Sequence, residues 1–304
     1  MRTQTGLFRL MRSLLPGCIS ITLGLSASTS ASAQASTGTG SGFYLGFGGS
    51  FNSVNADAQQ IYARGTSDVF NSAGTMVQTG SADGPPVPVF MDSQLSLAPS
   101  VQAGYFQHFA NSGWFWGGKV TYSYLNTTST TRNALIPQVG SFTTLSTGAV
   151  TPFTGNALIS NARATVLHQL AFIPSIGHSF GKFSLYAGAG PTLSQVRTNL
   201  NGLVGFADIN GTHTDVSGAA QNFADSNWVG GIIGMIGTTY FVGDSWYLDL
   251  NYSYAASRNQ TSKFASNFSN PNGLNDTSMT GTLVGSSTWK VITQSVGVSI
   301  NKLF

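Results

Sequence analysis

The chain has 304 residues, of which only 8% are charged, 12% are aromatic and 37 are glycine, and glutamate is absent. Three of its 13 Lys and Arg residues lie near the N-terminus, so the rest of the chain carries 13 − 3 = 10 basic against 10 acidic residues and no net charge. This balance argues against a nucleic-acid-binding protein, and the single cysteine excludes an internal disulfide.

The first 33 residues have the pattern of a secretory signal peptide. Three arginines at positions 2, 9 and 12 precede an apolar stretch, and Ala31-Ser32-Ala33 supplies the small residues that a signal peptidase requires. We therefore expect residues 1–33 to be removed after export. A short linker over 34–41 and one domain over 42–304 would remain.

Eight segments of that domain alternate apolar residues with small or polar ones. This period of two is typical of β-strands with one apolar face. The chain has no apolar run of about 18 residues that could form a transmembrane helix. In the clearest segment, Trp114, Trp116 and Val120 share a face opposite Lys119. The predicted strands cover about 42–54, 94–109, 114–125, 161–179, 183–197, 227–241, 245–255 and 288–304.

The connections between these strands fall into two groups. Three are turns of three or four residues, at 110–113, 180–182 and 242–244. The four that alternate with them are long, at about 55–93, 126–160, 198–226 and 256–287. Long unstructured loops are uncommon in a soluble compact domain. Transmembrane barrels, in contrast, have short periplasmic turns and long extracellular loops, so the pattern predicts periplasmic termini and extracellular loops.

Aromatic residues gather at both ends of the predicted strands. Such rings prefer the boundary between membrane and water. The two predicted girdles comprise Tyr105, Trp114, Trp116, Phe183, Tyr240, Trp246 and Phe304 beside the short turns, and Tyr122, Tyr124, Trp228, Tyr252 and Tyr254 at the other ends.

The final strand places Val296, Val298, Ile300 and Phe304 on one face and ends in an aromatic ring. With the eight strands and the opening Gly42-Phe43-Tyr44-Leu45-Gly46, residues 42–304 resemble the small bacterial outer-membrane β-barrel family of OmpA-like transmembrane domains and opacity-type porin-family surface proteins. The predicted fold is therefore an all-β, eight-stranded, up-and-down antiparallel transmembrane barrel. A ten-stranded barrel stays open, because residues 135–150 are mildly apolar.

The resemblance also implies a cellular setting. It implies an integral, monomeric protein of the Gram-negative outer membrane that contacts outer-membrane lipid and lipopolysaccharide. The barrel-assembly machinery would bind its C-terminal strand. No cofactor and no nucleic-acid partner is expected.

Several residues conflict with simple strands. Pro99, Pro174 and Pro191 fall inside predicted strands although proline cannot donate to a β-ladder. Gln294 and His168 would face lipid. We expect bulges or interrupted pairing near these positions.

Charged residues within a spanning strand should point into the lumen. The predicted lumen charges are Lys119, Arg163 and Asp249, with Arg197 near the outer mouth. Lys119 and Asp249 each follow a short turn by a few residues, so our hypothesis is that they pair across the lumen. The alternative is that water in the lumen solvates each of them.

Motifs for catalysis and metal binding are weak. His213 with Asp208 and Asp215 is the nearest match to an omptin-type protease, and His168 is the nearest match to a lipid A deacylase. The four histidines are dispersed, so no metal site is predicted. Eight strands leave a lumen that side chains can fill, which disfavours a wide pore.

The sequence therefore favours a non-enzymatic surface protein with a structural or adhesive role. A narrow channel for ions or small solutes is the first alternative, and an outer-membrane hydrolase is the second. A secreted soluble β-sandwich would also show alternating strands, but it would have to bury its outward aromatic rows in a core.

Overall fold

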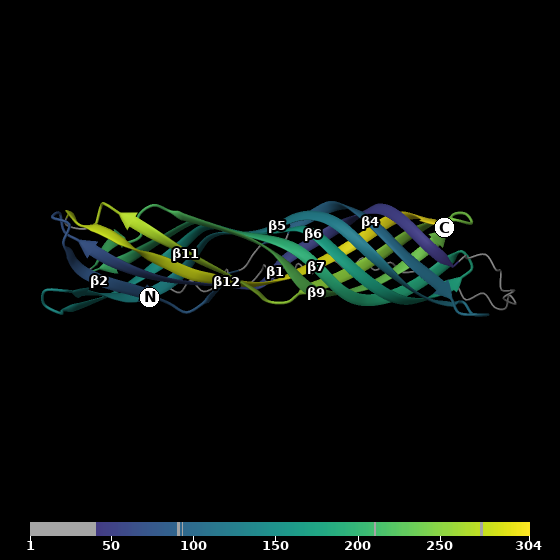
Figure 1. Cartoon of the computed structure of the whole chain (residues 1–304), viewed down its shortest axis with the longest axis horizontal. Helices are drawn as coiled ribbons and strands as arrows, with labels where there is room; N and C mark the ends of the chain where they lie inside the picture. The colour runs from purple at the N-terminus through teal and green to yellow at the C-terminus, as the bar shows by residue number, and fades with distance from the viewer. Residues whose placement is uncertain (1–40, 90–91, 93, 210, 274–275) are drawn as a thin grey trace, which may run out of the picture. The chain divides into compact units, whose positions relative to one another are not determined.

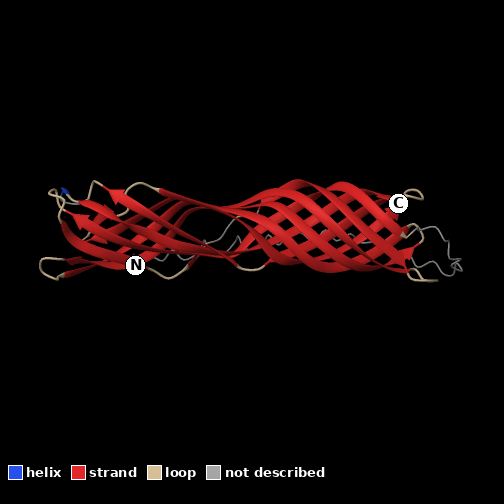
Figure 2. Cartoon of the chain, in the orientation of Figure 1, coloured by secondary structure: helices blue, strands red, loops and turns tan. Residues whose placement is uncertain are grey.

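The computed structural model describes residues 41–89, 92, 94–209, 211–273 and 276–304, which all belong to one compact unit, Thr37–Phe304. The predicted signal peptide and nearly all of the linker lie outside the described residues. Antiparallel strands account for most of the described chain (Figure 2). They are β1 (Gly42–Phe70), β2 (Met76–Asp83), β3 (Val87–Pro88), β4 (Gln94–His108), β5 (Trp114–Thr144), β6 (Val150–Phe180), β7 (Phe183–Ile209), β8 (Thr212–Asp215), β9 (Gln221–Phe241), β10 (Trp246–Ser257), β11 (Gln260–Asn270) and β12 (Ser278–Leu303).

Eight of these strands form a closed ring in the order β1, β4, β5, β6, β7, β9, β10, β12. The ring closes because β12 pairs with β1 along both strands, from Tyr44 opposite Leu303 to Phe70 opposite Ser278. The chain is an eight-stranded antiparallel β-barrel. The predicted fold is confirmed, and the region 135–150 adds no further strands to the ring, because it forms the hairpin between β5 and β6.

The register shifts as it passes around the ring. Paired residues can be followed from strand to strand around the ring. Starting at Trp114 on β5, seven successive pairs lead to Pro99 on β4. Ser100 pairs with Ser123, so Pro99 lies level with Tyr124 on β5. One circuit therefore shifts the register by 124 − 114 = 10 residues over eight strands. A stagger of this size tilts the strands by about 40° and leaves an interior that side chains can fill.

We call the end of the barrel that holds the short turns 109–113, 181–182 and 242–245 the proximal half. All eight strands of the ring take part in it. The four segments predicted as long loops are mostly strands, and this is a correction. They extend the sheet into a distal half, where β2 replaces β4 between β1 and β5. Figure 1 shows β2 and β11 at this end and β4 and β9 at the other.

Alternation explains why these segments fold. In the distal half, apolar side chains still point inward on every second residue, so Ile61, Ile136, Ile159 and Leu203 are fully buried and form one core. Thr, Ser and Asn recur on the outer face of the same strands, for example at Thr154, Ser160 and Thr280, and they mimic loop composition. The core continues through Ala56, Ala63, Val89, Ala157, Ala162, Ala164, Leu200, Phe268 and Leu283.

A seam between β9 and β11 interrupts the wall of the distal half. The pairing of β9 with β10 begins only at Gly231 opposite Ser257, and among the described residues the first part of β9 and the facing β11 share no ladder. Side chains bridge the seam at two places. The Ser266 hydroxyl donates to Gln221 Oε1 at 2.9 Å, and the Phe223 and Phe264 rings lie 4.6 Å apart.

The strands continue through the three prolines, but pairing is interrupted beside them, as expected. Pro174 and Pro191 lie on facing strands, and the described pairs between β6 and β7 stop at Ala171 and resume at Ser175 in the same register. Pro99 pairs with Gly49 on β1, while the pairs between β4 and β5 begin only at Ser100. Bulges occur at Asp57/Gln60, Tyr124/Thr127 and Val166/His168, and the last of these confirms the bulge expected near His168.

Candidate functional site: the barrel lumen

The outer face of the proximal half is apolar and edged by aromatic rings. The predicted girdle residues are exposed by 39–56% on this face at Trp114, Trp116, Tyr122, Tyr124, Trp228, Tyr240, Trp246, Tyr252 and Tyr254, and Tyr105 is half-buried. Val296, Val298, Ile300 and Phe304 are also exposed there. Trp114 and Tyr124 mark the two edges on β5, and ten residues at about 3.3 Å each and about 40° tilt span about 25 Å. That height matches the apolar band of membrane barrels.

The inner face of the same strands holds one buried ion pair. Lys119 Nζ on β5 lies 3.0 Å from Asp249 Oδ2 on β10, and both side chains are at most 4% exposed. The structure thus brings together two of the three predicted lumen charges. Neutralisation across the lumen is expected, since an unpaired charge at this depth would be strongly destabilising.

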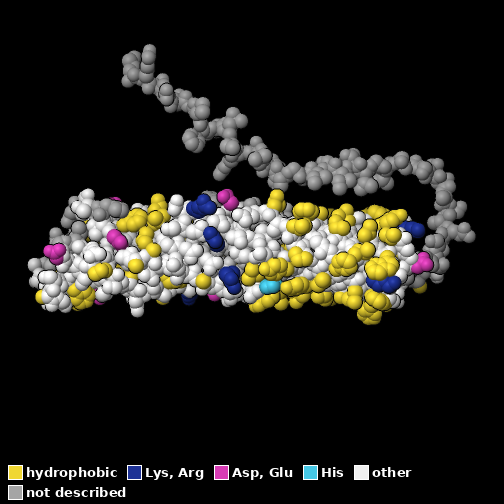
Figure 3. All heavy atoms as spheres, turned by 90° about the horizontal axis from the view of Figure 1, so that it is seen from above, with side chains coloured by type: hydrophobic (Ala, Val, Ile, Leu, Met, Phe, Trp, Pro, Cys, Tyr) yellow, Lys and Arg dark blue, Asp and Glu magenta, His cyan; other side chains and the backbone are white. Residues whose placement is uncertain are grey.

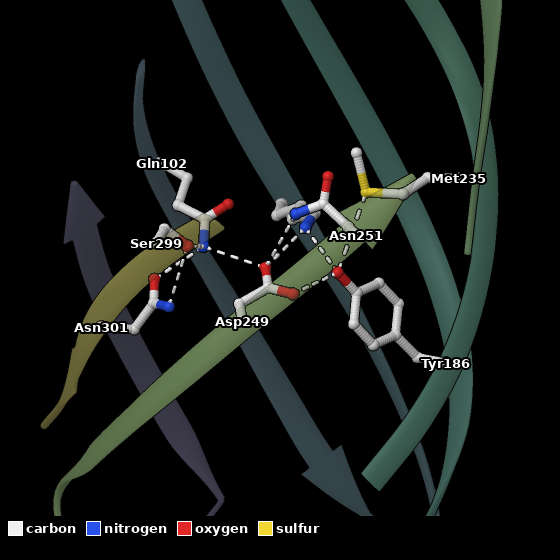
Figure 4. Close-up of polar contacts among 8 residues, drawn as sticks. Gln102, Tyr186, Met235, Asp249, Asn251, Ser299 and Asn301 are labelled. Carbon is white, nitrogen blue, oxygen red and sulfur yellow. Dashed lines mark hydrogen bonds and ion pairs between the residues drawn. The ribbon is translucent and has the colours of Figure 1, made fainter. Parts of the chain in front are cut away.

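Neutral side chains complete the pair (Figure 4). The Tyr186 hydroxyl donates to Asp249 Oδ1 at 2.7 Å and accepts from Lys119 Nζ at 2.9 Å. Gln102 Nε2 lies 3.2 Å from Asp249 Oδ2, and it also donates to Ser299 and Asn301 on β12. The carboxylate therefore has partners at both oxygens, and the network links β4, β5, β7, β10 and β12.

An aromatic layer closes the lumen on the side of the short turns. Tyr44, Phe241, Tyr247 and Leu303 are buried together, with Phe106 packed against them. The Tyr44 and Tyr247 rings meet edge to face at 5.6 Å. Beyond the polar network, Ile233 and Met235 point inward and pack against Ala171 and Ile173. These two β9 residues therefore line the lumen.

A second apolar layer, the waist, separates the proximal and distal halves. It is centred on Trp289, which is 1% exposed, and every member is at most 3% exposed. Seven of the eight strands of the ring contribute to it. Its members are Val54, Ala98, Leu125, Val166, Val196, Val229, Trp289 and Val291.

Arg163, the third predicted lumen charge, lies on the outer face instead. Val166 pairs with Val196 but His168 pairs with Gln195, so Leu167 is an extra residue that inverts the alternation. Ala164 and Val166 are therefore buried inside, and Arg163 is exposed. Arg197 is likewise exposed on the outer face rather than at the lumen mouth.

The two polar residues predicted to face lipid do lie on the outer face, where each has a tyrosine partner. The Tyr122 hydroxyl is 2.8 Å from His168 Nδ1, and the Tyr252 hydroxyl donates to Gln294 Oε1 at 3.2 Å. His168 also stacks near Trp228, with ring centroids 6.5 Å apart. All of these groups belong to the outer aromatic girdle.

The candidate catalytic groups are placed as follows. In the backbone register Asp208 on β7 lies opposite His213 on β8, and Asp215 Oδ1 accepts from the backbone amides of Ser217 and Gly218. The Asp215 carboxylate thus caps a turn. Within the part of the chain that the structure describes, no three His, Cys, Asp or Glu side chains are grouped to hold a metal ion. No helix of the described residues has the length and apolarity to cross a membrane.

Sequence reasoning missed most of the residues around the ion pair and the waist. Gln102 and Tyr186 alternate with outward apolar residues in the sequence, so their inward orientation, and with it a polar network in the lumen, could have been predicted. The inward position of Trp289 could also have been predicted, because the alternation that places Val296 on the outer face places Trp289 on the inner face. Which strands meet at the same depth depends on the stagger, which the sequence does not display.

No protein-family model and no curated protein matches this chain. Among solved structures, it is similar to the outer membrane protein OprG from Pseudomonas aeruginosa, with 11% identity, 87% of this chain and 97% of that chain covered, and a TM-score of 0.32. It is also similar to Neisserial surface protein A, with 11% identity, 82% of this chain and 99% of that chain covered, and a TM-score of 0.28. For the outer membrane protease OmpT from Escherichia coli, the identity is 8%, the coverage is 86% of this chain and 97% of that chain, and the TM-score is 0.25. Sequence identities and TM-scores this low do not allow site residues to be inferred from these structures. The fold assignment therefore rests on the closed ring itself.

Proposed function

We propose that this protein is an integral outer-membrane β-barrel with a closed lumen, which carries a folded β-sheet extension at the cell surface in a structural or adhesive role. The proposal includes periplasmic short turns and termini, a monomeric barrel, contacts with outer-membrane lipid and lipopolysaccharide, and insertion by the barrel-assembly machinery through β12.

The waist is the observation that carries the proposal of a closed lumen. Its apolar side chains come from strands all around the ring and leave at most 3% of any member exposed. Apolar constrictions exclude water and ions. The buried Lys119–Asp249 pair and the aromatic layer lie in series with the waist, so a permeating ion would have to displace three layers.

The distal half supports the surface role. β5 continues to Thr144, which is 144 − 124 = 20 residues beyond the outer girdle, or about 50 Å at the tilt of the barrel. Its filled core makes this extension an ordered structure that can present side chains to a partner. The proposed role is non-enzymatic, because the Asp215 carboxylate caps a turn and His168 contacts the aromatic girdle.

A narrow channel is the second candidate, and the polar network at Asp249 is the observation that favours it. Planar-bilayer recording with the purified protein tests the proposal against this candidate. We expect no steady conductance steps. Reproducible steps would contradict the closed lumen and would favour the channel.

A further inference from the structure

Three arginines occupy the outer face just beyond the outer girdle, on three consecutive strands. Arg132 lies on β5, Arg163 on β6 and Arg197 on β7, and all three side chains are exposed. Figure 3 shows Lys and Arg side chains gathered beside the edge of the hydrophobic band. We call these three residues the arginine arc.

The register places the arc at nearly one level around the barrel. Arg132 pairs with Asn161, two residues from Arg163, and Arg163 pairs with Asn199, two residues from Arg197. From Arg132 to Arg163, and from Arg163 to Arg197, the next arginine thus lies two residues closer to the girdle than the residue paired with the previous one. This offset is close to the mean stagger of 10/8 = 1.25 residues per strand, so the three arginines stay at nearly the same height. Diagonal neighbours of this kind are about 7–8 Å apart, so one phosphate group can be reached from two of them.

The level of the arc corresponds to the headgroups of a membrane. Arg163 is five positions beyond His168, one of which is the bulge residue Leu167, so it lies about 10 Å above the girdle. Headgroups extend about 5–8 Å beyond the hydrocarbon, and a long Arg side chain can cover the difference by snorkelling.

Within the described part of the chain, no ion pair neutralises the charge of the arc. Among the described side chains, no carboxylate lies within 4.0 Å of these guanidinium groups, since the one ion pair there is Lys119–Asp249. The neighbouring outward residues include neutral donors and acceptors, such as Thr128 and Thr165, whose hydroxyls are 2.9 Å apart. The exposed Asp92, which pairs with Thr130, is an acidic neighbour on the Arg132 side, but it makes no ion pair with the arc. Guanidinium groups bind phosphate with two parallel hydrogen bonds, so the arc fits a phosphorylated headgroup.

We propose that Arg132, Arg163 and Arg197 form a binding site for the phosphates of a phosphorylated glycolipid in the outer leaflet. The inference rests on the proposed function in one respect, namely that the girdle marks the outer edge of the membrane. It assigns the lipid contact to one side of the barrel, β5 to β7.

The test compares the mature protein in phosphatidylcholine bilayers with and without a lipopolysaccharide that carries two lipid A phosphates. The readout is the midpoint temperature of unfolding. We expect the phosphorylated lipid to raise it, and the triple variant Arg132→Gln, Arg163→Gln, Arg197→Gln to lose at least half of that rise. The matched control is Arg64→Gln, Lys182→Gln, Lys263→Gln, which removes three exposed charges elsewhere and should keep the full rise.

Two further arms identify the source of the phosphate. Dephosphorylated lipopolysaccharide should give the wild type no more stabilisation than the triple variant shows. Inorganic phosphate in lipopolysaccharide-free bilayers should not raise the midpoint temperature of unfolding. An equal rise in wild type and triple variant, or a rise with inorganic phosphate alone, would overturn the inference. Failure of the wild type to enter the bilayer would instead overturn the proposed function.

Discussion

At the scale of single residues, the most consequential group is the Asp249 carboxylate. It accepts from Lys119, Tyr186 and Gln102 in a site that solvent barely reaches. Asp249→Asn would leave the Lys119 ammonium buried without a counter-charge. We expect a loss of about 3–5 kcal/mol in the free energy of unfolding, measured by urea titration in lipid vesicles.

Asp244→Asn is the matched control, because Asp244 is exposed in a short turn. It should change stability little. Equal stability of the Asp249 variant and the wild type would show that water in the lumen solvates both charges.

Two glycines provide a contrast between the inner and outer faces. A Cβ at Gly48 would lie against the carbonyl of Val298 and 2.7 Å from the Cα of Ser299, whereas at Gly234 it would meet no atom within 4 Å. Gly48→Ala should therefore destabilise the barrel by about 1–3 kcal/mol. Gly234→Ala should leave stability unchanged or raise it by up to about 1 kcal/mol. Reversed effects in urea titration would contradict the assignment of faces.

At the scale of elements, the waist is one of the three layers that close the lumen. Trp289→Ala removes its largest side chain, and we expect a loss of about 3–5 kcal/mol in stability. The polar network and the aromatic layer still close the lumen of this variant, so we expect no conductance steps in planar bilayers. Trp228→Ala removes an indole from the outer face and should leave conductance unchanged. Steady steps in the Trp289 variant would show that the waist alone blocks the lumen.

The distal strands make a second prediction at this scale. Amide hydrogen exchange in β5 beyond the girdle should be slow for the amides over 128–143 that point toward β6, and from Val139 on also for those that point toward β2, because these amides belong to ladders over a buried core. The turn at 145–149 between β5 and β6 supplies the comparison and should exchange quickly. Fast exchange throughout 128–143 would favour the loops that composition suggests.

The elements also show how far the sequence could lead. Strict alternation and the short turns predicted the eight strands of the proximal half, and the lumen positions of Lys119 and Asp249 followed from their parity. The distal strands were missed because Thr, Ser and Asn on a solvated outer face look like loop residues. Arg163 was misplaced because one extra residue, Leu167, inverts the faces. A polar His168 on the lipid face suggested a bulge nearby, but it did not show that the faces invert before Arg163.

At the scale of the whole molecule, the central claim is that the outward rows of the proximal half face lipid. Cell fractionation of the expressed protein tests it most directly, followed by gel electrophoresis of unheated and boiled samples. The account predicts recovery in the outer membrane, extraction only with detergent, and faster migration before boiling. A monodisperse protein that stays dissolved in detergent-free buffer would contradict it.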